Sequence, residues 1–221
     1  KNTLKVIHRG VDLERFSATN ISENRIEALA RKWRLPDGVP VIMLPGRLTR
    51  WKGQEVFIQA IKKTGLNNLK CLIVGSDQGR HGYKASLEKL IEQTDLSDVI
   101  HLIDHCDDMP AAYVLADIVV SASVEPEAFG RVAVEAQALG RLVVATNHGA
   151  TQETIENGST GWLVKPNDAN AMAEILKTLL SYTREEREKI STLARRHISN
   201  NFSKEKMCEK TIKLYKSMVS N

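Results

Sequence analysis

The stretch V41-I-M-L-P-G-R-L-T-R-W-K-G53 indicates how the chain folds. It starts with an apolar run, turns at Gly46, and continues through a basic loop to Gly53. A short apolar run that ends in a glycine turn is typical of a strand buried on both faces of a sheet. Residues 54–63 have the pattern of a helix. The stretch therefore predicts a strand–loop–helix unit.

The same unit recurs along the chain. Apolar runs that predict strands lie at 71–75, 99–103, 117–122, 142–145 and 161–164. Helical stretches lie near 83–93, 109–115, 130–139, 151–156 and 168–180. This alternation is typical of a parallel sheet with right-handed crossovers and helices on both faces. We predict an α/β fold, with one doubly wound, Rossmann-like parallel sheet over 41–180.

Two segments flank that domain. Residues 1–40 are predicted to be an interdomain connector followed by a leading helix near 22–34. Residues 181–221 are predicted to form two C-terminal helices, about 183–201 and 203–219, with Ser203 as the N-cap of the second. They should pack on the central domain or on a domain that this chain lacks. The chain of 221 residues does not start with Met, so we expect it to be a piece of a longer protein.

Composition excludes several classes of protein. The chain is 42% hydrophobic and 26% charged, which is ordinary for a globular protein. It has no apolar run of about 18 residues that could span a membrane, and no signal peptide pattern at its start. The three cysteines, Cys71, Cys106 and Cys208, form no C-x-x-C pair. We therefore expect reduced thiols in a cytoplasmic protein.

The net charge is +4, and basic residues gather in the C-terminal helices. Acidic residues are interspersed among them, which favours solvated helix faces. The alternatives are a partner domain or peripheral contact with the inner face of a membrane. No aromatic residues interleave with the charges, so no nucleic-acid partner is predicted. His101 and His105 are four residues apart but lack a carboxylate partner, so no metal site is predicted there.

In a doubly wound sheet, ligands bind in the loops at the carboxyl ends of the strands. The first such loop carries Arg47, Arg50 and Lys52 between two glycines and leads into a helix. Cations next to a helix N-terminus suit a phosphate or diphosphate. The spacing is not that of an ATP-binding P-loop. A loop that is basic by chance remains the alternative. The loop G75-S-D-Q-G-R-H-G82 lacks the G-x-G-x-x-G spacing and favours a flexible turn over a dinucleotide site.

The most informative segment is S123-V-E-P-E-A-F-G-R-V-A-V-E-A136. Glu127 lies at the end of a predicted strand, and Phe129-Gly130 starts a helix whose first N–H groups should face the ligand crevice. Glu135 lies inside that helix among small apolar residues. A buried carboxylate needs a partner, and a pair of ligand hydroxyls is a natural one. Acids that cap the helix are the alternative.

These segments resemble a known family. E127-A-F-G-R-V-A-V-E135 is similar to the Glu–seven residues–Glu signature of retaining glycosyltransferases of the GT-B fold, family 4 (glycosyl transferases group 1). G46-R-L-T-R-W-K-G53 resembles the family's phosphate loop. H8-R-G-V-D-L-E-R-F16 resembles the start of its second domain, with Arg9 in place of the usual Asn. N147-H-G-A-T-Q-E153, with Ala150 in place of a Gly, and T160-G-W-L-V-K-P-N-D168 resemble later motifs. The resemblance covers nearly the whole chain.

The resemblance implies the C-terminal, nucleotide-sugar-binding half of such an enzyme, without the N-terminal acceptor domain. The donor would be a nucleoside-diphosphate sugar, most commonly UDP- or GDP-linked, and no cofactor or metal would be required. Arg47 and Lys52 would hold the diphosphate, Glu127 would face the transferred sugar, and Glu135 would bind the ribose. The base would pack near 102–106. The implied catalytic residues are Arg47, Lys52 and Glu127, and the implied donor-binding set is Gly46, Arg47, Lys52, Glu127, Ala128, Phe129, Gly130, Arg131 and Glu135.

The implied activity is hexosyl transfer, with retention, to a glycan or lipid-linked acceptor in polysaccharide biosynthesis. The isolated chain is expected to be inactive, because the acceptor pocket would lie in the other domain. A glycosidase role for Glu127 and Glu135 is set aside, since cations beside them suit a departing diphosphate better than attack by water. The alternatives are a non-catalytic nucleotide-sugar-binding module, a phosphorylase or epimerase of the same fold, and a dehydrogenase.

Overall fold

The computed structural model describes residues 4–79 and 81–219. Its centre is a six-stranded sheet in the order β3-β2-β1-β4-β5-β6, with every neighbouring pair parallel. The strands are β1 (Val41–Pro45), β2 (Lys70–Val74), β3 (Ile100–Ile103), β4 (Ile118–Ser121), β5 (Leu142–Thr146) and β6 (Trp162–Val164). The predicted doubly wound sheet is confirmed, and the strand order is that of a Rossmann fold.

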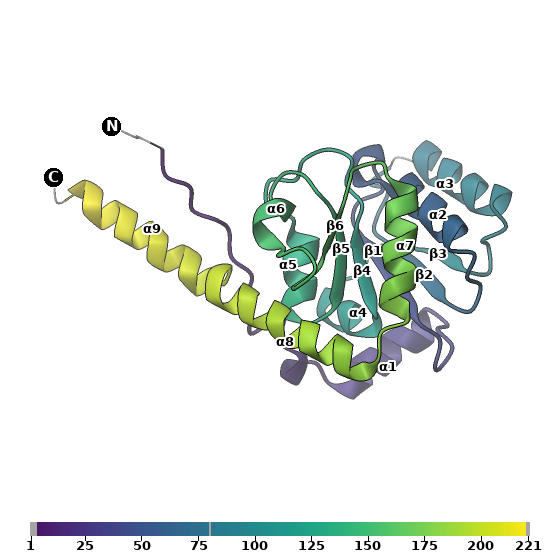
Figure 1. The fold of residues 1–221 in the computed structure, drawn as a ribbon, viewed down its shortest axis with the longest axis horizontal. Helices are drawn as coiled ribbons and strands as arrows, with labels where there is room; N and C mark the ends of the chain where they lie inside the picture. Colours follow the sequence, from purple (N-terminus) through teal and green to yellow (C-terminus); the bar gives the residue numbers. More distant parts are fainter. Residues whose placement is uncertain (1–3, 80, 220–221) are drawn as a thin grey trace.

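Helices cover both faces of the sheet (Figure 1). One hydrophobic core lies under α2 (Gln54–Thr64), α3 (His81–Gln93) and α7 (Ala169–Leu180). The core on the opposite face lies under α1 (Glu23–Lys32), α4 (Met109–Leu115), α5 (Arg131–Ala138) and α8 (Arg184–Asn201). The central strand β1 contributes Ile42 and Leu44 to the first core and Val41 and Met43 to the second. Burial on both faces is why its sequence is a continuous apolar run rather than an alternating one.

The remaining elements are short: the 3-10 turns η1 (Ala18–Asn20) and η2 (Arg50–Lys52), and α6 (Thr151–Thr154). Two predicted helices end earlier than expected. The leading helix stops at Lys32, because Arg34 adopts a left-handed backbone with φ of 52°. The helix predicted over 151–156 stops at Thr154, because Ile155 becomes extended to bury its side chain in the core.

The N-terminal stretch is tied to the junction between α8 and α9 (Lys204–Val219). The Val11 N–H donates to the Phe202 carbonyl at 2.8 Å, and the Lys204 N–H donates to the Val11 carbonyl at 2.9 Å. A Cβ atom on Gly10 would lie 2.3 Å from the Ser203 carbonyl oxygen, so only glycine fits at this crossing. The Lys206 N–H donates to Ser203 Oγ at 3.2 Å, which confirms Ser203 as a helix cap.

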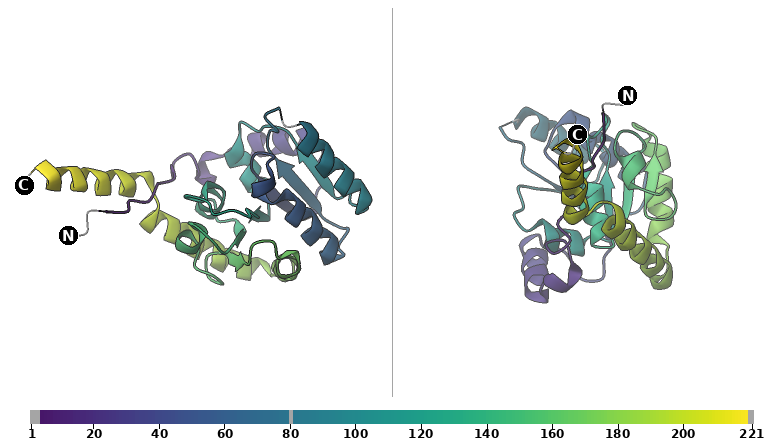
Figure 2. Two further views of the ribbon diagram at one scale, coloured as in Figure 1. Left: turned by 90° about the horizontal axis from the view of Figure 1, so that it is seen from above. Right: turned by 90° about the vertical axis from the view of Figure 1, so that its left-hand side faces the viewer.

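Beyond that junction, α9 projects away from the sheet, with the N-terminal stretch on the same side (Figures 1 and 2). None of the described residues of α9 is buried. Its apolar side chains Ile212, Tyr215 and Met218 are 52–69% exposed. The helix therefore has an apolar face without a partner in the described part of the chain.

The three cysteines are free thiols. Cys71 lies inside the sheet, and burial raises the pKa of its thiol. Within residues 4–79 and 81–219, no helix is long and apolar enough to cross a membrane.

Candidate functional site

The loops after β1 and β4 meet at one edge of the sheet. These two strands are neighbours, and the strand order reverses between them, so their carboxyl ends form the crevice in which doubly wound sheets bind ligands. The basic loop 46–53 and the acidic loop 123–130 therefore face each other, although they lie far apart in the sequence.

Lys52 and Glu127 join the two loops. Lys52 Nζ lies 2.7 Å from Glu127 Oε1, and the two side chains are 12% and 11% exposed. Ser123 Oγ donates to the same oxygen at 2.5 Å. Lys52 Nζ also lies 4.3 Å from the centroid of a Trp51 ring. Because the ion pair is nearly shielded from water, the Coulomb attraction between its two charges is stronger than in a surface pair, and both charges are desolvated.

Backbone contacts fix the basic loop. Gly53 has φ of 71°, and a Cβ atom there would lie 1.9 Å from the Ala122 carbonyl oxygen. A Cβ atom on Gly75 would lie 2.0 Å from the Gly46 carbonyl oxygen. The loops after β1, β2 and β4 thus touch through their backbones, and glycine is what allows it.

Arg47 is held by its backbone and not by its side chain. The fully buried Gln54 donates from Nε2 to the Arg47 carbonyl at 2.9 Å and accepts a hydrogen bond from the Tyr83 hydroxyl at 3.2 Å. The Arg47 side chain is exposed, and its guanidinium has no hydrogen bond or ion pair with the described residues. It is therefore available to a ligand.

Glu135 is buried, with 7% of its surface exposed. The fully buried Tyr113 donates its hydroxyl to Glu135 Oε2 at 3.1 Å. Arg131 donates to Oε1 from Nε at 3.0 Å and from Nη2 at 2.7 Å. Burial, together with the Glu135 charge, raises the pKa of Tyr113 well above its usual value, so Tyr113 stays a neutral donor. The hydrogen bond to Glu135 raises the pKa of Arg131.

These contacts answer the expectation that Glu135 needs a partner. The protein itself supplies two, Tyr113 and Arg131. Glu135 nevertheless lines a cavity, so it can also meet a ligand.

The turn 147–153 contacts the loop before α5 and fixes the start of that helix. The Ala150 N–H donates to the Glu127 carbonyl at 3.0 Å, and a Cβ atom on Gly149 would lie 2.8 Å from the same oxygen. His148 Nε2 lies 2.7 Å from the Ser123 carbonyl oxygen. The turn 147–153 thus supports the acidic loop and presents the first turn of α5 toward the crevice.

The other predicted residues of this segment differ in exposure. Gly130, the N-cap of α5, has φ of 71° and is buried, while Ala128 is exposed. The buried Phe129 ring contacts Phe202, with the ring centroids 6.4 Å apart. Phe129 therefore anchors the loop to the junction between α8 and α9.

A cavity of about 350 Å³ lies at the carboxyl ends of the strands and is lined by Gly46, Arg47, Gly75, Ser76, His105, Cys106, Tyr113, Arg131 and Glu135 among others. Lys52 and Glu127 are not among its lining residues. Of the stretch 102–106 expected near a base, His105 and Cys106 face this cavity. Leu102 and Ile103 instead pack against the two cores.

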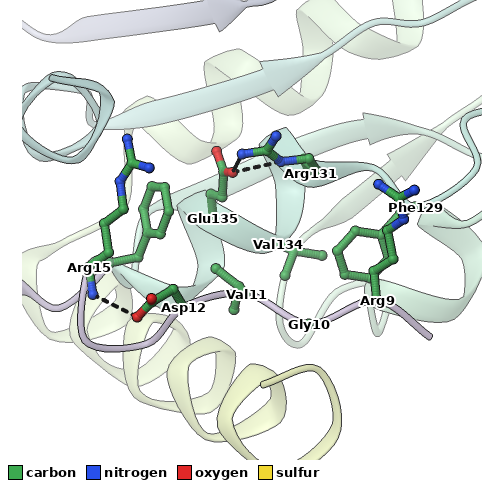
Figure 3. Close-up of a pocket in the computed structure, with 10 residues that line it drawn as sticks. Arg9, Gly10, Val11, Asp12, Arg15, Phe129, Arg131, Val134 and Glu135 are labelled. Carbon is green, nitrogen blue, oxygen red and sulfur yellow. Dashed lines mark hydrogen bonds and ion pairs between the residues drawn. The ribbon is translucent and has the colours of Figure 1, made fainter. Parts of the chain in front are cut away.

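A second cavity, of about 300 Å³, shares Arg131 and Glu135 as a common wall (Figure 3). Its other lining residues come from the N-terminal stretch and α5: Arg9, Gly10, Val11, Asp12, Arg15, Phe16, Phe129 and Val134. In the described part of the chain, no group of three or more His, Cys, Asp or Glu side chains could hold a metal ion.

Two of these contacts were not predicted from the sequence. Tyr113 lies in an apolar helical stretch, where only its hydroxyl gives a signal: a buried tyrosine hydroxyl needs a partner. Ser123 precedes the two acids directly, but nothing in its spacing indicates which one it binds.

The strand order, the two loops and the Glu–seven residues–Glu segment at the crevice together define the C-terminal, Rossmann-like domain of a GT-B glycosyltransferase. The family model for glycosyl transferases group 1 matches residues 25–197, and the chain belongs to that family.

Known proteins agree with this assignment. The D-inositol 3-phosphate glycosyltransferase of Corynebacterium urealyticum is 32% identical over 225 residues, covering 99% of this chain and 52% of that protein. A glycosyltransferase from Rickettsia africae superposes with a TM-score of 0.94 at 37% identity, over 98% of this chain and 57% of that one. Anabaena HepE, in complex with UDP-glucose, superposes with a TM-score of 0.88 at 27% identity, over 96% of this chain and 57% of that one. The chain thus spans about half the length of the relatives it matches.

Proposed function

We propose that this chain is the donor-binding domain of a retaining glycosyltransferase, which moves a hexosyl group from a nucleoside-diphosphate sugar to a glycan or lipid-linked acceptor. The observation that carries the proposal is the pairing of charges at the crevice. Lys52 holds Glu127, Arg131 holds Glu135, and Arg47 is left without a partner among the described residues. A ligand with both phosphates and hydroxyls matches this set.

The diphosphate would bind Arg47, Lys52 and the first N–H groups of α5. A guanidinium, an ammonium and a helix N-terminus are three independent sources of positive potential. As the bond to the sugar breaks, negative charge develops on the leaving diphosphate. Cations fixed in place before the reaction stabilise that charge without reorganising. Arg47 and Lys52 are the catalytic residues of the proposal for this reason.

The carboxylates would bind hydroxyls. Glu135 would accept hydrogen bonds from the ribose and Glu127 from the transferred sugar, with Glu127 Oε2 available since Lys52 and Ser123 both bind Oε1. The base would lie beside His105 and Cys106, which line the same cavity as Glu135. That HepE was crystallised with UDP-glucose supports a nucleotide-sugar donor, with UDP or GDP as the carrier.

The acceptor would bind between this domain and another. The chain covers 52–57% of the relatives described above, and the face of α9 with Ile212, Tyr215 and Met218 has no partner in the described residues. We infer that a second domain covers this face and supplies the acceptor pocket. The isolated chain should then bind nucleotides without transferring sugar.

The test is calorimetric titration of the chain with UDP, GDP and ADP, each beside its own nucleoside. One diphosphate should bind, and Arg47→Ala should weaken it by about tenfold or more while changing nucleoside binding little, because a hydrogen bond to a charged group contributes about 1.5–3 kcal/mol. Arg31→Ala, on the exposed side of α1, is the matched control and should behave as the unaltered chain.

Two results would count against the proposal. If no diphosphate binds, the domain does not form a donor site by itself. If Arg47→Ala weakens nucleoside and diphosphate equally, Arg47 does not contact the phosphates.

A further inference from the structure

The Glu135 carboxylate accepts three hydrogen bonds from the protein itself. Arg131 donates two of them to Oε1, from Nε and Nη2, and the Tyr113 hydroxyl donates the third to Oε2. A carboxylate has about four lone-pair sites, so about one of them, on Oε2, is left for a ligand. The ribose that we assign to Glu135 has two neighbouring hydroxyls. Both of them can bind this carboxylate only if one of the protein donors is displaced.

The two protein donors differ in how easily they can be displaced. Tyr113 is 1% exposed, and its hydroxyl has no other hydrogen bond with the described residues, so its release would leave a polar group buried and unpaired. The Arg131 side chain is 70% exposed, and its guanidinium would return to water. An ion pair with one exposed partner is the weaker contact. A ribose that binds through both hydroxyls should therefore displace Arg131 and leave Tyr113 in place.

Arg131 lies where its guanidinium can meet a phosphate instead. It is the first residue of α5, after the N-cap Gly130, and its side chain runs along the helix to Glu135 (Figure 3). Side chains of a helix lean toward its N-terminus, so a change of rotamer can turn the guanidinium toward the N–H groups that we assign to the diphosphate. The helix dipole disfavours a cation at that end until an anion binds there. Because phosphate and ribose are joined in a nucleotide, one arginine can exchange Glu135 for phosphate.

We propose that the Arg131 side chain is a specificity residue, which favours a nucleoside diphosphate over the bare nucleoside. This inference rests on the proposed donor function. The ribose takes the place of Arg131 on Glu135, and the phosphate binds the guanidinium that is released. A nucleoside displaces Arg131 without offering it a new partner and therefore binds less tightly. Arg47 and Lys52 raise the affinity for phosphates, whereas Arg131 also lowers the affinity for ligands that lack them.

The test compares UDP, uridine and 2′-deoxyuridine as ligands of the unaltered chain and of Arg131→Ala, by calorimetry for UDP and by NMR titration for the nucleosides. If GDP is the nucleotide that binds, the guanosine series replaces them. Arg131→Ala should weaken UDP binding about tenfold, the usual effect of losing one charge-assisted hydrogen bond. It should tighten uridine binding about two- to fivefold, since an ion pair with an exposed partner no longer has to be broken. The two affinities should thus change in opposite directions.

The deoxynucleoside shows whether the ribose hydroxyls cause the gain. It keeps one of the two neighbouring hydroxyls, which the remaining site on Glu135 Oε2 can accept without displacing Arg131. Its affinity should therefore stay the same in Arg131→Ala. Arg131→Lys keeps a positive charge at the start of α5 and should bind UDP more tightly than Arg131→Ala does. Arg31→Ala is the matched control, because Arg31 also pairs with a glutamate four residues away, Glu27, and it should change none of the affinities.

Three results would overturn the inference: weaker binding of both UDP and uridine in Arg131→Ala, equal gains for uridine and 2′-deoxyuridine, or unchanged binding of UDP. Each of them, with UDP still bound by the unaltered chain, leaves the donor function standing. If the unaltered chain binds no nucleoside diphosphate, the donor function is wrong and this inference with it. Circular dichroism checks that Arg131→Ala keeps the fold, as expected for a side chain that is 70% exposed.

Discussion

At the residue scale, the crevice between the loops after β1 and β4 depends on backbones that touch. Gly53 is the clearest case, because its left-handed φ of 71° and its contact with the Ala122 carbonyl both exclude a side chain. It ends the turn that carries Lys52 and starts α2. The position of the Lys52 ammonium is thus set by a residue that bears no functional group.

We predict that Gly53→Ala destabilises the fold by at least about 2 kcal/mol, since strain at a positive φ and a backbone clash add together. Gly65→Ala is the matched control. Gly65 has φ of 67°, but a Cβ atom there would meet nothing within 4 Å. Gly65→Ala should therefore lower the free energy of unfolding only by the backbone strain, about 1 kcal/mol. Urea unfolding of both variants measures the difference, and equal losses would mean that the contact with Ala122 relaxes freely.

The sequence indicates the chemical type of the site residues better than their partners. Arg47, Lys52, Glu127 and Glu135 stand out because charged groups follow buried strands or interrupt an apolar helix. That Lys52 and Glu127 form an ion pair depends on strands far apart in the sequence becoming neighbours. Our assignment of these residues to the donor stays a prediction until a ligand is bound.

At the element scale, an ion pair between Arg25 and Asp108, called the clamp below, holds α4 to α1. Arg25 binds Asp108 with two hydrogen bonds, Nε to Oδ2 at 2.8 Å and Nη2 to Oδ1 at 2.7 Å. Asp108 also caps α4 by accepting the Ala111 N–H at 3.2 Å. The helix in turn carries Tyr113, so the clamp connects the leading helix with the Glu135 carboxylate.

The clamp predicts a pH dependence of stability. The hydrogen bonds from Arg25 lower the pKa of Asp108 below its usual value. The stabilisation is therefore complete above the unfolded-state pKa of about 3.9 and is lost as the pH falls through the lower folded-state value. Asp108→Asn should cost about 0.5–1 kcal/mol at pH 7, a modest figure because the pair is partly exposed. This difference in unfolding free energy between Asp108→Asn and the unaltered chain should vanish once the pH is below the folded-state pKa of Asp108.

Thermal unfolding of the unaltered chain and of Asp108→Asn, measured from pH 7 down to about pH 2, checks this prediction. Arg25→Gln should show the same pH profile, since it breaks the same pair from the other side. A constant difference between Asp108→Asn and the unaltered chain at every pH would mean that the cap, and not the ion pair, carries the effect.

The elements themselves could be predicted because each strand is a separate apolar run. The ends of two helices, α1 and α6, could not be predicted in the same way, because they depend on features outside the helices' own sequence patterns. The stop of α1 depends on Arg34 adopting a left-handed backbone, which is uncommon for arginine. The stop of α6 depends on a core position for Ile155 that exists only once β5 and β6 have paired.

At the scale of the whole molecule, α8 and α9 differ sharply. Ala194 and Ile198 of α8 are fully buried, whereas no described residue of α9 is buried. The sequence indicates that both are amphipathic helices. It could not show which of them the sheet domain covers, because that depends on what surrounds the apolar face of each.

We predict that a chain ending after Cys208 keeps the melting temperature of the full chain within about 2 °C, because little apolar surface is returned to water. The cut preserves the bonds between Val11 and residues 202–204. Ala194→Asp is the contrasting variant: it places an unpaired charge in the core under α8 and should unfold the domain. Calorimetry measures both, and a large drop on truncation would show that α9 contributes to the fold of this domain.

The paired charges at the crevice have one more consequence. In the empty domain Lys52 is neutralised by Glu127, and Arg131 by Glu135. Under the proposed function, a bare phosphate that binds Lys52 or Arg131 in addition to Arg47 would draw that cation from its carboxylate and leave the acid unpaired, and a plain sugar would leave the cation unpaired. A molecule that offers phosphates and hydroxyls together would satisfy both members of each pair. Under the proposed function, the domain would then discriminate against inorganic phosphate and free sugars through these charge pairs, without a steric barrier.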